Sequence, residues 1–173
     1  MSDSNNPFDA FNQAISQHNN GQPQQLTPEL TAKLVNVILF ALVSGLVVMA
    51  TILVGIDFLK KLNNPVFEID PLLAALGIAG LTTSIILPPI IRAVPPDKKL
   101  NETELCQKFQ ISMIVKYGIL EGAAFASIFM NQSLSLFGVG VFVVLVIAMI
   151  FSYVTTNQVH DYIKHVRENS EFD

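Results

Sequence analysis

Four long apolar runs constrain the fold of this chain more than any other feature of its sequence. They cover Leu34–Phe58, Pro71–Ile91, Phe109–Met130 and Leu134–Val154. Each run is long enough for an apolar helix of roughly 20 residues, which is the length that crosses a bilayer core. A helix also satisfies its own backbone hydrogen bonds, which lipid cannot do. We therefore predict an all-α membrane protein with a four-transmembrane-helix bundle, multi-pass in a cell membrane.

Composition supports a membrane protein and excludes several other classes. Hydrophobic residues make up 51% of the chain and charged residues only 14%, whereas soluble domains carry about 25% charged residues. The chain has no basic patch that would indicate nucleic-acid binding. Cys106 is its one cysteine, so it has no intramolecular disulfide. Since no nucleophile–base constellation, cofactor motif or metal-ligand cluster is present, we predict no enzyme activity, no cofactor and no metal.

Polar segments flank the apolar runs. Residues 1–27 are rich in Asn and Gln, and such a tract buries too little apolar surface to offset its ordering entropy, so we predict disorder. Thr27 is suited to cap the helix that follows. Residues 155–173 form a second polar segment, in which four apolar side chains share one helical face: Val159, Tyr162, Ile163 and Val166. This stripe predicts an amphipathic helix against the membrane surface or against the connector between spans two and three.

The distribution of Lys and Arg predicts the orientation. With four spans, the N-terminal tail, the middle connector and the C-terminal tail share one side, and this side holds Lys33, Arg92, Lys98, Lys99, Lys108, Lys164 and Arg167. The other side holds only Lys60 and Lys61. Because cytoplasmic loops carry the excess of positive charge, we predict that both termini are cytoplasmic.

A single carboxylate interrupts the third run. Glu121 lies in "YGILEGAAFASIF", residues 117–129, among small side chains. An intramembrane charge costs about 3 kcal/mol on insertion scales, and desolvation favours the neutral carboxylic acid. Tyr117, four residues earlier, is placed to donate its hydroxyl to the carboxyl. Gly118, Gly122 and Ala126 form a small-xxx-small row that lets another helix approach closely.

The second run offers a matching stretch, "ALGIAGLTTS". If spans two and three are antiparallel, Gly80 to Ser84 lies at about the depth of Glu121. We therefore expect Glu121 to sit against this stretch, with Gly80 in the helix packing. One hypothesis makes Glu121 an ion-binding carboxylate assisted by Tyr117, Thr83 and Ser84. The other makes it a neutral side chain whose hydrogen bond fixes helix packing.

The stretch "FQISMIVKYGILEGAAFASIF" resembles the carboxylate-bearing helix of the c subunit, or proteolipid, of rotary ATP synthases. The resemblance covers roughly residues 71–130 and implies a proton- or sodium-binding carboxylate at Glu121. The chain departs from that family in three ways: the alternate-glycine motif is missing, the chain has four predicted spans instead of a single hairpin, and Pro88 and Pro89 are expected to kink span two.

The whole chain is more similar to an uncharacterised bacterial family of four-helix inner-membrane proteins. The features that carry this resemblance are Asn6-Pro7-Phe8, Leu120–Phe125 and the segment Val159–Val166. It implies architecture and not mechanism. The sequence thus leaves two functions open: a structural or accessory component, homo-oligomeric or bound to another membrane protein within the lipid bilayer, and an ion-coupled translocation component.

Overall fold

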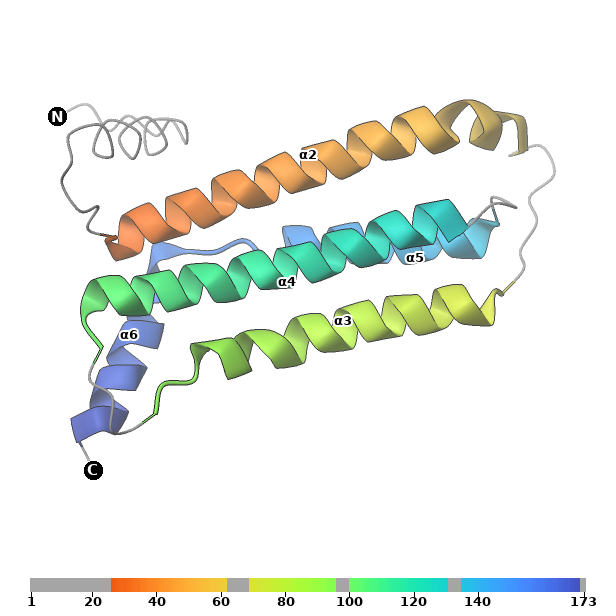
Figure 1. The fold of residues 1–173 in the computed structure, drawn as a ribbon. Helices are drawn as coiled ribbons and strands as arrows, with labels where there is room; N and C mark the ends of the chain where they lie inside the picture. The colour runs from red at the N-terminus through yellow and green to blue at the C-terminus, as the bar shows by residue number, and fades with distance from the viewer. Residues whose placement is uncertain (1–25, 62–68, 96–99, 131–134, 172–173) are drawn as a thin grey trace, which may run out of the picture. The chain divides into compact units, whose positions relative to one another are not determined.

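The computed structural model describes residues 26–61, 69–95, 100–130 and 135–171, including all of their side chains except those of 53–61, 170 and 171. Throughout this described part the regular structure is helical, without a strand. Figure 1 shows the helices in chain order: α2 (Pro28–Lys61), α3 (Pro71–Arg92), α4 (Glu102–Met130), α5 (Leu136–Ile150) and α6 (Thr156–Glu171). The all-α class is therefore confirmed. The predicted disordered tail, 1–27, lies outside the described residues except for its last two.

Short polar side chains mark the starts of these helices. Thr27 Oγ1 accepts the backbone N–H of Leu30 at 3.3 Å, which confirms the predicted cap of α2. At α4, Asn101 Oδ1 accepts the N–H of Glu104 at 2.9 Å, and Glu104 Oε2 accepts the N–H of Asn101 at 2.8 Å. This reciprocal pair is a capping box, which satisfies two backbone donors that the helix itself leaves unpaired. Asp70 caps α3 in a similar way through a 2.8 Å bond to its first turn.

Three helices are long and apolar enough to cross a membrane, namely Pro28–Ile52 within α2, the whole of α3 and the whole of α4. The fourth predicted span differs. Helix α5 has 15 residues and is therefore about 22 Å long, which is less than the roughly 30 Å of a bilayer core. Its helix is shorter than the predicted span Leu134–Val154, so as a helix alone it falls short of a crossing.

Polar contacts explain why α5 ends before its apolar run does. Phe151 and Ser152 form a turn, and residues 153–155 have no helical or strand assignment. The hydroxyl of Ser152 donates to the carbonyl of Ala148 at 2.7 Å. The phenol of Tyr117 donates to the carbonyl of Ser152 at 2.8 Å. That carbonyl is thereby satisfied by a side chain instead of by a further turn of helix.

The chain divides into two compact units, and α2, α3 and α4 each contribute residues to both. We call one the α6 unit; it comprises the described parts of Met1–Ile38, Ile90–Ile114 and Val154–Asp173. The other is the α5 unit, which comprises the described parts of Leu39–Pro89 and Val115–Tyr153. Each unit has its own kind of packing.

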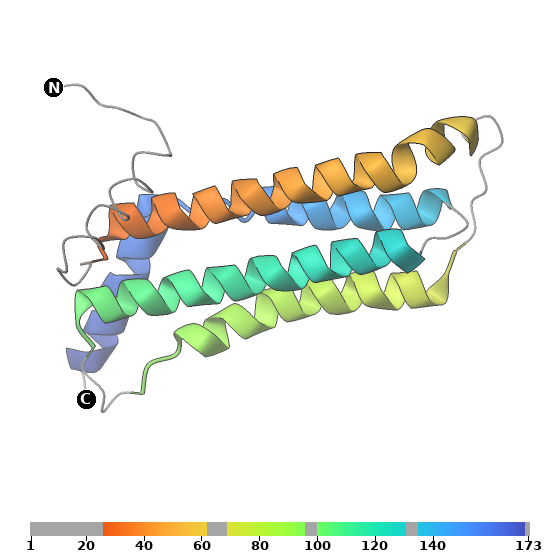
Figure 2. The same ribbon diagram turned by 45° about the horizontal axis from the view of Figure 1, so that its top comes forward.

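In the α6 unit, helix α6 crosses the first half of α4, as Figures 1 and 2 show. Its predicted apolar stripe is buried there, with Val159 0% and Ile163 4% exposed. The ring of Tyr162 packs against Phe109 with ring centroids 5.7 Å apart. Its hydroxyl donates to the carbonyl of Arg92, at the end of α3, at 3.0 Å. Of the two predicted locations, the stripe therefore packs on protein and does not lie open toward a membrane surface.

In the α5 unit, glycines allow helices to approach closely. An ideal Cβ on Gly80 of α3 would lie 2.6 Å from the Cβ of Ala123 of α4. An ideal Cβ on Gly77 would lie 2.9 Å from a methyl group of Val141 of α5. Any side chain larger than hydrogen would thus push neighbouring atoms apart. Both views show the α3 and α4 segments of this unit side by side.

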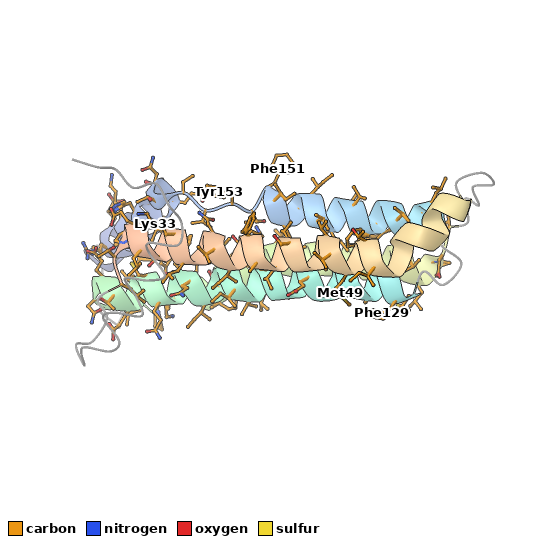
Figure 3. All side chains as sticks on the ribbon, turned by 90° about the horizontal axis from the view of Figure 1, so that it is seen from above. Lys33, Met49, Phe129, Phe151 and Tyr153 are labelled. Atoms are coloured by element: carbon orange, nitrogen blue, oxygen red, sulfur yellow. The ribbon has the colours of Figure 1, made fainter. Side chains whose placement is uncertain are left out.

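Large apolar side chains remain exposed along the helices. They include Phe40, Val48 and Ile52 of α2, Ile78, Ile85 and Ile86 of α3, and Val144 and Ile150 of α5. Phe151, which follows α5, is 86% exposed, and Tyr153 is 60% exposed; both are labelled in Figure 3. An apolar surface of this extent marks an interaction with lipid or with protein. An exposed Tyr just beyond the end of an apolar helix is typical of the aromatic belt at a membrane–water interface.

Candidate functional site

Helix α4 carries Glu121, the one acidic residue in the apolar part of that helix. The side chain is half-buried. Three neighbours on α4 are fully or almost fully buried: Leu120, Ala124 and Ser127 are each 0% exposed. Glu121 therefore lies at the border of the packed side of α4, and its neighbours decide what it contacts.

The packed side of α4 contacts α3 through Ala123, which meets Gly80. At 100° per residue, Glu121 lies about 160° around the helix axis from Ala123. The carboxyl therefore points away from the face that meets Gly80. The expectation that Glu121 sits against the stretch from Gly80 to Ser84 does not match this geometry, because a residue two positions from the contact lies on nearly the opposite side of a helix.

The hydroxyls that we expected around Glu121 are engaged elsewhere or lie exposed. Tyr117 donates to the carbonyl of Ser152, at 2.8 Å. Ser84 is buried and donates to the carbonyl of Leu81 in its own helix, also at 2.8 Å. Thr83 is exposed. Neither Tyr117 nor Ser84 has its hydroxyl proton free for Glu121, so the expected ion-binding set is not brought together.

The outward side of α4 carries the two glycines that flank Glu121. Gly118 and Gly122 are exposed, and an ideal Cβ on either would meet nothing within 4 Å. Phe129, farther along α4, is 60% exposed and labelled in Figure 3. We call Gly118, Glu121 and Gly122 the glycine face. Of the predicted packing residues, only Gly80 provides a close approach within the described structure, while Ala126 is half-buried.

Glu121 has no hydrogen bond or ion pair to any residue that the structure describes. A neutral carboxylic acid both donates and accepts hydrogen bonds. Leaving such a group unpaired in an apolar surrounding costs about 1–3 kcal/mol. The described residues also lack any group of three or more His, Cys, Asp or Glu that would hold a metal ion. Among the described residues, the carboxyl is therefore left without a polar partner.

Two polar side chains of the α6 unit, Asn36 and Arg92, have partners that the sequence did not specify, although an amide in the first apolar run favours a packing role. Asn36, on apolar helix α2, binds both backbone groups of Val154: its Nδ2 donates to the carbonyl at 2.7 Å, and its Oδ1 accepts the N–H at 2.9 Å. Arg92, the last residue of α3, packs its guanidinium over the ring of Phe109, 4.6 Å from the centroid. In the sequence, the features that could have indicated these contacts are an amide side chain inside an apolar run and an arginine at the end of one.

No protein-family model matches this chain, and no curated protein or solved structure is significantly similar to it. The resemblance of residues 71–130 to the proteolipid of rotary ATP synthases thus rests on the quoted residues alone.

Proposed function

We propose that the chain is a multi-pass membrane protein with both termini on the cytoplasmic side, in which α5 contributes the fourth crossing. The length of helix α5 plus that of three extended residues, 153–155, is about 32 Å. Lipid tolerates non-helical backbone where protein groups satisfy it. Asn36 satisfies Val154 and Tyr117 satisfies the carbonyl of Ser152. The excess of Lys and Arg in the tails and the middle connector supports the orientation.

Protease treatment of sealed vesicles of known orientation tests this topology. Both tails should be cleaved from the cytoplasmic side, and neither from the other side. Cleavage of one tail from each side would mean an odd number of crossings and would contradict the fourth span.

Within the membrane, we propose a structural role: the chain assembles with a second copy of itself through the glycine face. The observation that carries this proposal is a half-buried carboxyl without a described partner, flanked by two exposed glycines that have open space in front of them. Small residues four apart let two helix backbones approach closely. A polar group beside them then gains a hydrogen-bond partner that lipid does not offer.

A second copy is favoured because the face is self-complementary. In a two-fold dimer, the same surface meets itself. A neutral Glu121 on one copy donates a hydrogen bond to the Glu121 carboxyl of the other copy and accepts one in return. Two glycine rows meet in the same interface without side chains between them. A different partner helix would have to supply its own donor and acceptor at this depth.

Disulfide cross-linking in lipid vesicles tests the interface. The one native cysteine, Cys106, is 0% exposed, and the Cys106→Ser background removes it altogether. In that background, Gly118→Cys and Gly122→Cys should form dimers under mild oxidation, since two cysteines cross-link only when their Cα atoms approach within about 7 Å. Gly45→Cys is the matched control, because Gly45 is also an exposed glycine of an apolar helix with open space around it. Equal cross-linking at all three positions would mean random collision and would contradict the interface.

Replacements of Glu121 separate this proposal from ion translocation, the function that the proteolipid resemblance implies. Glu121→Gln keeps a donor and an acceptor, so dimerisation should persist, whereas Glu121→Ala should weaken it by about threefold to tenfold. An ion-binding carboxylate would not tolerate Gln. Carbodiimide labelling of Glu121 that falls with added sodium or rising pH, together with cation flux abolished by Glu121→Gln, would favour translocation and contradict a purely structural role.

A further inference from the structure

The end of α3 holds an arginine in a fixed position within the α6 unit. The guanidinium of Arg92 lies over the ring of Phe109, 4.6 Å from its centroid. Its Nε donates to the hydroxyl of Ser112 at 2.8 Å, and its Nη2 contacts the sulfur of Met113 at 3.4 Å. Stacking on Phe109 and the hydrogen bond from Nε fix the orientation of the planar guanidinium. A guanidinium has further N–H groups, and these have no acceptor among the described residues.

A second cation lies beside this arginine. Lys108 of α4 is half-buried, and its Nζ donates to the carbonyl of Ala93 at 2.8 Å. Ala93 directly follows Arg92, so both positive groups adjoin the same short piece of backbone. Neither Arg92 nor Lys108 is ion-paired with a described carboxylate. Two other cations of this unit are ion-paired, Arg167 with Glu102 at 3.1 Å and Lys164 with Glu168 at 3.8 Å, whereas Lys33 of α2 is exposed and has no ion pair to a described carboxylate.

Exposed isoleucines accompany these two cations. Ile90 precedes Arg92 by two residues and is 61% exposed, and Ile111 follows Lys108 by three residues and is 45% exposed. Arg92 also ends a helix that is apolar and long enough to cross a membrane. A phosphate group with attached alkyl chains matches two uncompensated cations next to an apolar surface at the end of a membrane helix. A free phosphate would use the cations and leave the isoleucines uncovered.

We propose that Arg92 and Lys108 form a binding site for the phosphate group of an anionic phospholipid. The guanidinium contributes directed N–H donors, which suit phosphate oxygens, and the ammonium contributes a mobile charge. Phe109 and Ser112 act as positioning residues because they hold the guanidinium in place. The role goes beyond assembly through the glycine face, which uses residues of the α5 unit.

Native mass spectrometry of the purified full-length chain in detergent tests this site. Titration with dioleoyl phosphatidylglycerol should give tighter binding than titration with zwitterionic dioleoyl phosphatidylcholine. Arg92→Gln should weaken phosphatidylglycerol binding by about tenfold, and Lys108→Gln by severalfold. Phosphatidylcholine binding should be the same in all variants. Equal affinity of the unmodified chain for the two lipids would overturn the proposal.

Lys33→Gln is the matched control. Lys33 is an exposed lysine of the same unit, on α2, and the substitution changes net charge by the same amount. It should leave phosphatidylglycerol affinity within about twofold of the unmodified chain, because a distributed charge contributes only modestly. If Lys33→Gln weakens binding as much as Arg92→Gln does, then attraction is general and the assigned site is wrong.

Two further measurements, a competition with inorganic phosphate and a check of the fold of the variants, complete the test. Inorganic phosphate at millimolar concentration should not displace the lipid. If phosphate does displace it and binds as tightly as phosphatidylglycerol, the site binds free phosphate, and the assignment to lipid is overturned. Arg92→Gln also removes a packing contact, so its fold is checked by circular dichroism and size exclusion. If that variant unfolds, Lys108→Gln provides the test, since the Lys108 ammonium bonds to the exposed carbonyl of Ala93 and the Arg92–Phe109 stack is left in place; unchanged affinity in Lys108→Gln would contradict the proposal.

Discussion

The two units of this chain are stabilised by different chemistry. The α6 unit relies on directed contacts: the Asn36 amide on Val154, the Arg92 guanidinium over Phe109, and the Tyr162 hydroxyl on a carbonyl. The α5 unit has one such directed contact, the Tyr117 hydroxyl on the carbonyl of Ser152, and otherwise relies on close approach of backbones, at the pairs Gly80–Ala123 and Gly77–Val141. Directed contacts specify which segments meet, and small residues determine how near they come.

This difference follows from the apolar runs themselves. Inside lipid, burial of apolar side chains does not drive helices together, because lipid tails are equally apolar, so packing and a few polar groups must suffice. Where the helices carry polar residues at their ends, hydrogen bonds and ring contacts become available. Substitutions in the α5 unit should therefore destabilise the chain by overpacking, and substitutions in the α6 unit by loss of hydrogen bonds.

The largest effect is expected at Gly80. Gly80→Leu places a side chain where even a Cβ would lie 2.6 Å from the Cβ of Ala123. The free energy of unfolding should fall by about 3 kcal/mol, since overpacking forces backbones apart. The measurement is reversible unfolding of the purified chain in mixed micelles, followed by circular dichroism.

Two controls sharpen this prediction. Gly118→Leu should change stability by much less, because an ideal Cβ there meets nothing within 4 Å. Gly80→Ala should also be destabilising, and Ala123→Gly should recover part of that loss in the double variant, because the two Cβ atoms compete for one space. Additive effects in the double variant would show that Gly80 and Ala123 do not share this contact.

The next effect tests the directed contacts. Asn36→Leu keeps the side-chain size roughly constant but leaves both backbone groups of Val154, a residue 2% exposed, without their partner. Loss of a partner for buried polar groups should lower the unfolding free energy by about 2 kcal/mol. Thr51→Val is the control, since its hydroxyl bonds only within its own helix, to the carbonyl of Val47, and should cost less than about 0.5 kcal/mol. Similar losses for both variants would mean that the Asn36 bonds contribute little.

A smaller effect is expected at Tyr117. Tyr117→Phe removes the donor to the carbonyl of Ser152 and keeps the buried ring. One lost hydrogen bond should cost about 1 kcal/mol, and hydrogen exchange at the end of α5 should become faster. Tyr153→Phe provides the comparison, because Tyr153 is 60% exposed and should change neither quantity. An unchanged exchange rate in Tyr117→Phe would mean that another contact ends α5.

The long apolar runs were predictable because hydropathy is summed over many residues in each of them. Span two, predicted as 71–91, matches α3 almost residue for residue, and the stripe of Val159 and Ile163 is buried as its periodicity indicated. The end of α5 was not predictable from hydropathy. Residues 134–154 form one apolar run, and the groups that satisfy the backbone after the helix come from Asn36 and Tyr117, on other helices.

The candidate site was predictable in its central residue and not in its surroundings. A lone carboxylate in an apolar run identifies Glu121 without any structure. The side chains that Glu121 faces depend on the rotation of α4 about its own axis. The sequence does not specify this rotation, because small residues occur on both sides of the helix. The contact of Ala123 with Gly80 settles the rotation, and it turns Gly118 and Gly122 outward.

The smallest effect concerns pH and Tyr162, in the α6 unit. Burial raises the pKa of the Tyr162 phenol above its ordinary value near 10; Arg92 opposes this shift and Cys106 adds to it. Because the folded-state pKa is the higher one, the contribution to stability is fully present below pH of about 10 and is lost as the pH rises through the folded pKa. The contribution of Tyr162 to the unfolding free energy should therefore be constant from neutral pH to about 9.5 and then fall.

Tyr162→Phe isolates this group from the other tyrosines. The variant should lose about 0.5–1 kcal/mol at neutral pH, because the bond to the carbonyl of Arg92 is gone. The difference from the unmodified chain should shrink as the pH rises above 10, where the phenol is no longer an advantage to the folded state. Unfolding titrations at several pH values measure both quantities. A difference that stays constant up to pH 11 would mean that the phenol is not buried against α4, and that the contacts of the α6 unit are weaker than their geometry indicates.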